Sequence, residues 1–410
     1  MSSPLKVIII GSGQLYKGVA GLSLAHGLGK EGIEYEIFDK RGPATPQRDW
    51  GITVHWAIEF LNLYPRDFAQ RLRTAQVVER RSEKPAEFVL FHNGQTGEVI
   101  KEIPLGPARR FSHRKIRALL AEDINVQYNK ELVAISQTTD GVEVAFADGT
   151  TAKGSIIIGC DGSRSATRDI LFDHAPEGKW NPLPGFVLNN FWMQYDAEKA
   201  VKLKEQLGSF LDISIHPNGT YYGLIPLDIS ADAAPENWKF QVFMGLPSDI
   251  KPEDDSPARR FEMVKEAGKP FVEPFRSAIE WMPEGTYISP DRYGTWETRP
   301  WDHRGGRVLI AGDAAHSMTA HRAQGLNHSL QDILNIIKGL KEIKAGKISM
   351  VDFATSYVEE VASRGSEEVR MSLQQGLAVH NWDLTKTMPI LKIGTTPLHM
   401  DQTIVPLPAQ

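Results

Sequence analysis

Two short apolar segments, each ending in a glycine turn, constrain the fold of this chain more than any other feature. Residues 6–10 run into Gly11-Ser12-Gly13, and residues 307–311 run into Gly312-Asp313. An apolar run without alternation is typical of a parallel strand that is buried on both faces. Because the two strands lie far apart in the chain, we predict that the polypeptide returns to its N-terminal sheet after a long excursion.

The first turn opens a strand–helix–strand unit, with a strand at 5–10, a helix near 19–31 and a strand at 33–39. In the dinucleotide fingerprint Gly-x-Gly-x-x-Gly, the first two glycines allow a tight turn and close approach to a pyrophosphate, and the third allows the helix to pack on the strand. Gly11 and Gly13 supply the first two glycines. Residues 14–18 then interrupt the motif, so that Gly21 becomes the third.

Three acidic residues follow predicted strands. Asp39 ends the second strand, where a carboxylate can accept a hydrogen bond from a ribose hydroxyl. Asp161 follows a buried strand at 155–159, a pattern that by itself predicts only the start of a helix. Asp313 follows the strand at 307–311 and has no basic neighbour, so it can accept a hydrogen bond from a ligand hydroxyl. Three such turns in this order favour a nucleotide cofactor.

Between residues 173 and 290 the apolar residues alternate with polar ones, which predicts an antiparallel sheet with one covered face. Its strands are predicted at 186–195, 212–216, 221–226 and 239–245. Hairpin strands are predicted at 131–138 and 141–147, with a turn at Asp148-Gly149. A loop is predicted at 41–52, and helices at 55–64, 113–122, 257–268, 273–282, 325–346 and 350–380.

Composition narrows the function. The 410 residues are 41% hydrophobic and 24% charged with a net charge of −5, which is ordinary for a globular protein and unfavourable for a nucleic-acid partner. Cys160 is the single cysteine, and the twelve histidines form no His-Glu-x-x-His pattern, so we expect neither a disulfide nor a metal site. No apolar run approaches the roughly 18 residues of a membrane helix, and no secretory signal is recognised, so we expect a cytoplasmic protein without a membrane partner.

Taken together, these motifs resemble those of the single-component, class A flavoprotein monooxygenases of the para-hydroxybenzoate hydroxylase type, most closely the fungal members from secondary-metabolite pathways. The resemblance runs from residue 5 to about residue 380. It implies an α/β fold: a Rossmann-like FAD-binding domain of the para-hydroxybenzoate hydroxylase/glutathione reductase type, an inserted antiparallel-sheet substrate domain and C-terminal helices. We place the first part of the FAD-binding domain at 1–172 with a substrate-domain excursion near 65–110, the substrate domain at 173–290, the return segment at 291–350, and C-terminal helices and tail at 351–410.

The resemblance also implies a set of FAD-binding residues. In the family, the fingerprint and the acid after it bind the ADP part, the Asp-Gly motif supports FAD and passing NAD(P)H, the Gly-Asp motif binds the flavin-side ribose, and the next loop lies against the isoalloxazine ring. The matching positions are Gly11, Gly13, Gly21, Asp39, Asp161, Gly162, Ser165, Arg168, Asp313, Gln324, Gly325, Leu326 and Asn327. Arg48 and Gly51 resemble a further flavin-contacting loop. The family arginine of the helix at 113–122 aligns with His113, and Arg114 stands beside it; we prefer Arg114 because a permanent charge suits a diphosphate.

The resemblance implies hydroxylation of an aromatic or polyketide-derived molecule with NAD(P)H and O₂, and leaves the oligomeric state open. No catalytic base is identified; His216, Tyr221 and Tyr222 are the candidates, and Asn190, Trp192, His316 and His321 are further pocket or loop residues. Two alternatives stay open. One is another flavin oxidoreductase, such as an epoxidase or a reductase, and the other is a non-catalytic relative in which the insert at residues 14–18 impairs FAD binding.

Overall fold

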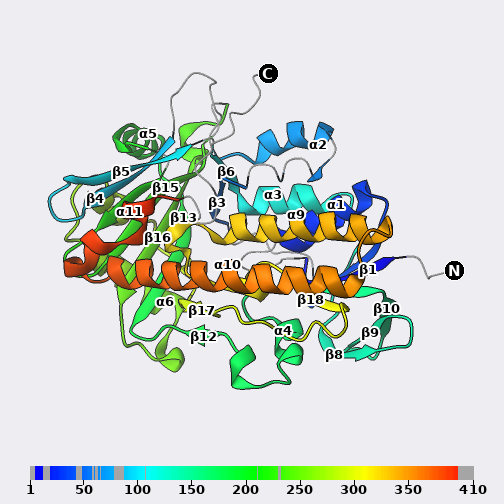
Figure 1. The fold of residues 1–410 in the computed structure, drawn as a ribbon. Coiled ribbons are helices and arrows are strands. Elements are labelled where there is room, and N and C mark those ends of the chain that lie inside the picture. Colours follow the sequence, from blue (N-terminus) through cyan, green and yellow to red (C-terminus); the bar gives the residue numbers. More distant parts are fainter. Residues whose placement is uncertain are drawn as a thin grey trace.

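A parallel sheet in the order β18-β11-β1-β2-β7 forms one half of the protein (Figure 1). A computed structural model describes residues 5–12, 19–42, 49–57, 60, 63–64, 66–77, 87–106, 108–209, 211–229 and 232–395. The strands are β1 (Lys6–Ile10), β2 (Glu34–Phe38), β7 (Val126–Gln127), β11 (Ile156–Gly159) and β18 (Val308–Ile310). Because β11 lies between β1 and β18, the chain does return to its N-terminal sheet as predicted.

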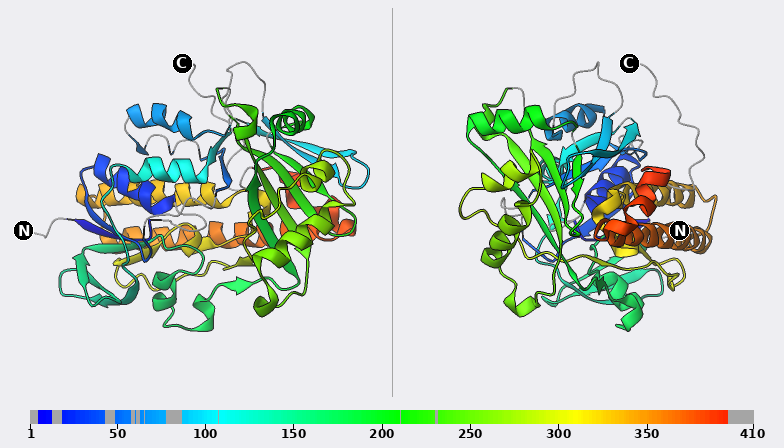
Figure 2. Two further views of the ribbon diagram at one scale, coloured as in Figure 1. Left: turned by 180° about the vertical axis from the view of Figure 1, so that it is seen from behind. Right: turned by 90° about the vertical axis from the view of Figure 1, so that its left-hand side faces the viewer.

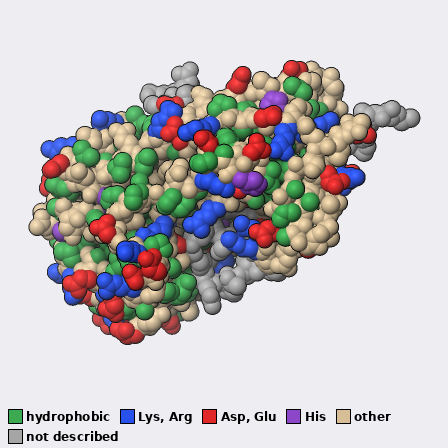
Figure 3. All heavy atoms as spheres, turned by 90° about the horizontal axis from the view of Figure 1, so that it is seen from below, with side chains coloured by type: hydrophobic (Ala, Val, Ile, Leu, Met, Phe, Trp, Pro, Cys, Tyr) green, Lys and Arg blue, Asp and Glu red, His purple; other side chains and the backbone are tan. Residues whose placement is uncertain are grey.

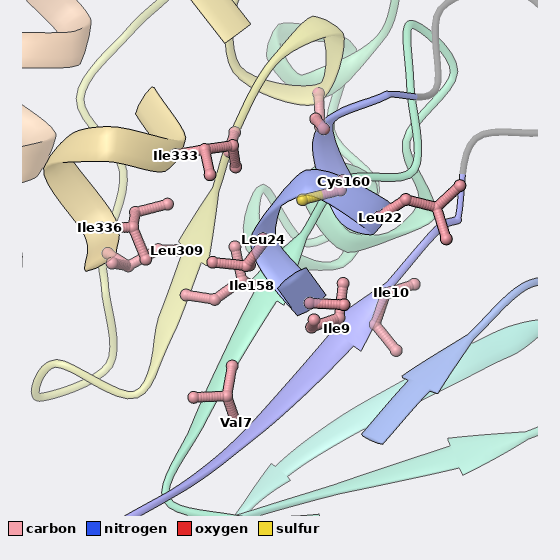
Figure 4. Packing of buried hydrophobic residues seen from close by; sticks show 14 of the residues in the cluster. Val7, Ile9, Ile10, Leu22, Leu24, Ile158, Cys160, Leu309, Ile333 and Ile336 are labelled. Atoms are coloured by element: carbon pink, nitrogen blue, oxygen red, sulfur yellow. The ribbon is translucent and has the colours of Figure 1, made fainter. Parts of the chain in front are cut away.

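Helices cover this sheet and make its core. They are α1 (Ala20–Lys30), α3 (His113–Ala121), α9 (Gly325–Lys344) and α10 (Met350–Val379), of which α1 packs on α9 and α9 on α10. The side chains that meet where α1 and α9 approach the strands are Leu22, Leu24, Ile333, Ile336, Ile9, Ile158 and Leu309 (Figure 4). Each buried side chain of this kind contributes about 1.5–3 kcal/mol. No helix in the described part of the chain has the length and apolar character needed to cross a membrane.

The first helix approaches the first strand at a contact between two glycines. Gly11 has φ +98°, and a Cβ built on Gly21 would lie 2.0 Å from the carbonyl oxygen of Gly11. Only a residue without a side chain fits there, which is the role of the third glycine in the fingerprint. The predicted assignment of that role to Gly21, on the far side of the insert, therefore agrees with the geometry.

A three-stranded sheet packs against the parallel sheet. Its strands are β8 (Leu132–Gln137), β9 (Val142–Phe146) and β10 (Thr151–Gly154), and the predicted turn at Asp148-Gly149 joins β9 to β10. Phe146 of β9 contacts Phe38 of β2 with ring centroids 4.6 Å apart. This contact joins the two sheets into one hydrophobic core.

The second half of the molecule is built on a six-stranded sheet in the order β13-β16-β15-β14-β4-β5 (Figure 2). Its strands are β4 (Glu87–Asn93), β5 (Val99–Gly106), β13 (Phe186–Met193), β14 (Asp212–Ile215), β15 (Tyr221–Asp228) and β16 (Lys239–Pro247). The predicted sheet was antiparallel with one covered face. The four predicted strands, β13 to β16, do pair antiparallel. The sheet differs from the prediction because β4 and β5 join it, with β4 parallel to β14, and because β14 is buried on both faces. One face packs under helices and the other faces the cavity described below.

The remaining elements connect these layers. They are β3 (Gly51–Val54), β6 (Arg109–Ser112), β12 (Asn181–Pro182), β17 (Gly294–Thr295), α2 (Arg66–Arg71), α4 (Ala166–Leu171), α5 (Ala197–Gln206), α6 (Pro257–Gly268), α7 (Phe275–Glu280), α8 (Asp313–His316) and α11 (Pro389–Ile393), with 3₁₀ turns η2 (Leu72–Ala75), η3 (Pro176–Gly178), η4 (Pro235–Asn237), η5 (Pro252–Asp254), η6 (Ala320–Arg322) and η7 (Trp382–Thr387).

Two secondary-structure predictions are wrong in this part of the chain. Strand β3 begins inside the predicted loop at 41–52, and the described residues of the predicted helix at 55–64 form bends, a turn and 3₁₀ conformation rather than α-helix. Strand β3 forms because it pairs with β6, a long-range contact that local pattern does not reveal.

Two alanine substitutions in helix α1 test the glycine contact. Gly21→Ala places a methyl group against the Gly11 carbonyl, so we expect a loss of about 1–3 kcal/mol of unfolding free energy. Gly29→Ala is the matched control, because its nearest neighbour, Tyr35 Cε1, would lie at 3.8 Å and alanine favours helix. Thermal unfolding compares the two. Equal melting temperatures for both variants would show that the helix does not depend on the contact.

Candidate active site

Two cavities meet between the halves of the molecule. The turn cavity lies over the ends of the parallel strands, and the sheet cavity, of about 230 Å³, lies under the six-stranded sheet. Met318, Thr319 and Ala320 line both, as does Leu188 of β13. The segment between α8 and α9 therefore forms a shared wall, and one elongated ligand can occupy both cavities.

The turn cavity is built from the glycine turns and from Asp39. Gly11 lines it, and the buried carboxylate of Asp39 accepts hydrogen bonds from the Ser12 amide (2.9 Å), the Ser12 hydroxyl (2.7 Å) and the Arg41 amide (3.0 Å). A carboxylate offers about four acceptor positions. Hydrogen bonds from described residues take three of these positions on Asp39 and leave the fourth to another group, such as a ligand hydroxyl.

The Asp-Gly and Gly-Asp motifs are held together by a buried arginine. The Arg168 guanidinium donates to the backbone oxygens of Gly178 (2.8 Å) and Ala314 (2.9 Å) and lies 4.6 Å from the centroid of Trp296. Asp161 accepts from the amide of Thr167 (2.9 Å), so it caps the start of α4. Asp161 and Asp313 both line the turn cavity. Asp161 therefore organises its loop while it borders the cavity.

Basic side chains surround this region. Figure 3 shows Lys and Arg side chains gathered around a hollow on the face seen from below. The cations that line the turn cavity are Lys40, Arg41, Lys130, Arg164 and Arg292. The same lining contains five carboxylates, on Asp39, Glu131, Asp161, Asp291 and Asp313, so the cavity offers both cations for phosphate groups and acceptors for hydroxyl groups.

The start of α9 and strand β3 form one end of the sheet cavity. Asn327 is fully buried and ties the two together: its Oδ1 accepts from the His55 amide (3.0 Å) and its Nδ2 donates to the Thr53 carbonyl (3.1 Å). Gly325 and Leu326 line the cavity itself. The first amides of a helix have no partner within the helix and carry partial positive charge. This end of the cavity therefore suits a group that becomes negative.

The structure distinguishes the two residues predicted on the next helix. His113 is buried, lines the sheet cavity and stacks on Trp50 with centroids 4.0 Å apart. Burial lowers the pKa of His113 to about 3, so the ring is neutral. Arg114 instead turns toward Asp49, with 3.7 Å between its Nε and the Asp49 Oδ2. Arg114 is not among the residues that line either cavity, and its predicted contact with the FAD diphosphate stays a prediction.

A half-buried arginine that the sequence reasoning missed lies in the sheet cavity. Arg110 of β6 donates to Thr53 Oγ1 (2.9 Å) and to Gln241 Oε1 (2.8 Å), and the same Gln241 oxygen accepts the Gly51 amide (2.8 Å). Gln241 Nε2 in turn donates to Asn190 Oδ1 (2.8 Å). The available signal was the alternation of Arg110 with the buried Phe111 on a strand beside a cavity.

Of the three residues predicted as candidate bases, only Tyr221 lines the sheet cavity. Tyr221 lines the sheet cavity, whereas Tyr222, next on the same strand, faces the opposite side and packs against Phe275 with ring centroids 5.1 Å apart. His216 lies outside both cavities, where its Nδ1 accepts the Asn218 amide (3.1 Å). Of the other two sheet residues, Asn190 lines the sheet cavity and Trp192 lies under the Lys239 ammonium instead.

The two loop histidines have different surroundings. His316 is fully buried and pairs through Nε2 with Asp332 Oδ2 (2.8 Å), which also accepts the Gly312 amide (2.7 Å). Burial alone would raise the pKa of Asp332, but His316 and Arg364 lower it to about 2. His316 thus supports the turn from behind. His321 lines the sheet cavity. Gly13, the insert at residues 14–18 and Arg48 lie outside the described residues.

Comparison with known proteins gives these cavities a context. A family model described as an FAD binding domain matches residues 111–372. The FAD-dependent monooxygenase phnB of Penicillium herquei is 32% identical over 406 residues, which cover 97% of each chain. The FAD-dependent monooxygenase cctM of Talaromyces islandicus is 30% identical and covers 95% of this chain and 96% of its own.

Solved structures share the fold at lower identity. HpxO of Klebsiella pneumoniae, complexed with FAD and uric acid, has a TM-score of 0.73 and 19% identity over 93% of this chain and 91% of its own. A salicylate hydroxylase substrate complex has a TM-score of 0.72 and 16% identity over 95% of this chain and 93% of its own. At this identity the match supports the architecture.

The neutral state of His113 predicts a pH dependence. Its pKa is about 3 in the folded protein and 6.5 ordinarily, so below pH 6.5 the unfolded chain binds a proton that the folded chain does not. Its share of stability is full above pH 6.5 and falls as the pH drops toward 3, by about 1.4 kcal/mol per pH unit. In denaturant titrations at several pH values, His113→Asn should remove the His113 share of the slope of unfolding free energy against pH. The same change at the exposed His174 should leave it, and an unchanged slope in both variants would contradict a buried neutral His113.

Proposed function

Because this chain belongs to the FAD-dependent monooxygenases, we propose that it hydroxylates an aromatic or polyketide-derived small molecule with electrons from NAD(P)H and one atom of O₂. The observation that carries the proposal is the junction of the two cavities. A polar, phosphate-compatible cavity over the strand ends opens at residues 318–320 into an apolar cavity under the sheet. A cofactor and an organic substrate can therefore meet at one place.

The residues of the turn cavity fit FAD. Asp39 keeps one acceptor position for a ribose hydroxyl, Asp313 borders the same cavity, and a Cβ on Gly162 would meet no atom within 4 Å. The start of α9, with Gly325 and Leu326, suits the end of the flavin ring that gains negative charge. When bound, FAD supplies the hydride uptake and the reaction with O₂.

The side chains of the sheet cavity would bind and orient the substrate and exclude water from it. The apolar residues of the sheet cavity come from all six strands of the six-stranded sheet and include Val89, Phe91, Leu105, Ile213, Ile225, Phe243 and Leu188. Such a wall accepts a flat apolar molecule and excludes water. Arg110 and Gln241 offer polar groups at one end, where an oxygen of the substrate can be recognised.

The similar proteins also support an aromatic or polyketide-derived substrate. Fungal proteins named as FAD-dependent monooxygenases cover nearly the full length of this chain, which agrees with a role in secondary-metabolite biosynthesis. Uric acid and the substrate of a salicylate hydroxylase occupy proteins of the same fold. Uric acid is a planar molecule, as the proposed aromatic substrate would be.

Removal of the acid at the Gly-Asp turn tests the cofactor assignment. Asp313→Ala should weaken FAD binding roughly 5- to 150-fold, because a ribose hydroxyl would lose its acceptor at a cost of about 1–3 kcal/mol. Flavin fluorescence during titration of the apoprotein measures the affinity. The exposed Asp140 supplies the control, since Asp140→Ala should bind FAD as the wild type does. Unchanged affinity in Asp313→Ala would mean that the motif serves another purpose.

The reaction itself is tested with purified, FAD-loaded protein and a panel of phenols. We expect NADH or NADPH oxidation to accelerate when a substrate is added, and ¹⁸O from ¹⁸O₂ to enter the product. Faster oxidation without incorporation of oxygen would indicate a reductase. A colourless protein that takes up no added FAD would indicate a non-catalytic relative.

A further inference from the structure

A layer of buried charges lies between helices α9 and α10, which run side by side (Figure 1). One member is Arg322 of η6, which is fully buried and lines the sheet cavity as part of the shared wall. Its Nη1 donates to Glu368 Oε1 of α10 over 2.5 Å. Glu368 is 1% exposed and lines neither cavity. The ion pair therefore has its cation in the cavity wall and its anion behind that wall.

Three polar atoms of this ion pair are unused. The Nε and Nη2 of Arg322 and the Oε2 of Glu368 are buried without a hydrogen-bond partner among the described residues. Removal of two charges from water is costly, and their attraction repays the cost only when further hydrogen bonds complete the pair. The pair is thus a poor source of folding stability. Its remaining physical effect is the electric field that it produces in its surroundings.

The pair lies against the first turn of α9. Only two residues separate Arg322 from Gly325, where α9 begins. His328 belongs to the same first turn, and its Nε2 lies 3.6 Å from Glu368 Oε2. The first amides of α9 have no partner within the helix, and this helix start forms one end of the sheet cavity. The field of the ion pair therefore adds to that of the helix start.

Both charges act on the lining of the sheet cavity. His55 belongs to that lining, and burial lowers its pKa to about 4. The Ala323 carbonyl and Glu368 raise the same pKa, whereas Arg322 lowers it. Salt and water screen buried charges much less than exposed ones. A charge that forms on a ligand in the cavity would therefore also respond to Arg322 and Glu368.

The second cation of the layer has more partners and lies farther from the cavities. Arg364 donates to Asp332 Oδ1 (2.6 Å) and to Glu360 Oε1 (2.5 Å), and it lines neither cavity. It also donates to His328 Nδ1 (2.9 Å), so the ring hydrogen of a neutral His328 is on Nε2. Of the two arginines, Arg322 is thus the one that presents its charge to the cavity.

We propose that Arg322 and Glu368 set the reduction potential of the FAD that this chain binds. Two-electron reduction with uptake of one proton adds one negative charge to the flavin. A fixed cation beside the helix start favours that charge, and therefore favours the reduced flavin. Glu368 holds the cation in the wall and offsets part of its field. The inference goes beyond the proposed function, because it needs bound FAD and no particular substrate.

Two glutamine variants test the proposal by the sign of their effects. The FAD-loaded protein is reduced at equilibrium, without substrate, against a reference dye of known potential. Arg322→Gln should lower the midpoint potential of the flavin below that of the wild type, because the cation is lost. Glu368→Gln should raise it, because the cation loses its counter-charge. Shifts of the same sign in both variants, or no shift in either, would indicate a structural role alone and overturn the proposal.

An exposed ion pair on the same helix supplies the control. Arg370 lies two residues from Glu368 on α10 and pairs with Glu297 at 2.8 Å, with both side chains at least half exposed. Because solvent screens this pair, Arg370→Gln should keep the midpoint potential of the wild type. A shift in this control as large as that in Arg322→Gln would mean that the buried position has no special effect.

A double variant covers the case in which a glutamine variant does not retain FAD. A buried ion pair that is exchanged for apolar residues of similar size usually keeps the fold, so Arg322→Met combined with Glu368→Leu is the replacement. It should lower the midpoint potential, because the cation is the member in the cavity wall. An equal or higher potential in this variant would contradict the proposal. Failure of the wild type to hydroxylate any substrate would refute the proposed function and leave these potentials unaffected.

Discussion

The parallel pairing of β1, β11 and β18 is the constraint on which the rest of the structure depends. These strands come from three distant parts of the sequence, and their hydrogen bonding aligns Ile8 with Ile157 and Ile157 with Val308. Because the pairing is parallel, all three carboxyl ends lie at one edge. The turns at Gly11, Asp161 and Gly312 therefore meet, and no one of them makes a cofactor site alone.

Buried charge fixes these turns once the sheet has brought them together. Arg168 reaches from α4 to the backbone after Asp313, and Asp332 reaches from α9 to the Gly312 amide. An unpaired buried ion is strongly destabilising, so each of these ions needs its partners in place. Asp332 has them in His316 and in Arg364, which lies 2.6 Å away. Helix α10 therefore supports the cofactor turn without touching the turn cavity.

Sequence reasoning succeeded where one local rule decided the outcome. The role of Gly21 followed from the requirement for close helix–strand packing, and the buried strands followed from continuous apolar runs. It failed where distant partners decided. Strand β3 forms by pairing with β6, and β4 joins the predicted strands by a parallel pairing with β14; both depend on contacts that no local period encodes. Arg110 was missed because Gln241, its acceptor, is on another strand.

The sheet cavity contains two kinds of polar group, and the difference follows from how each is held. Arg110, Gln241 and Asn190 are joined by hydrogen bonds that fix their side chains beside the cavity, while the Arg110 Nε has no partner among the described residues. The ring nitrogens of His321 have no hydrogen-bond partner among the described residues, and the ring packs against the aromatic rings of Tyr221 and Tyr293. One part of the cavity wall is therefore held by hydrogen bonds between side chains, and another by the packing of aromatic rings. A ligand can find polar partners in both parts, because Arg110 and His321 each keep a nitrogen that no described residue contacts by a hydrogen bond.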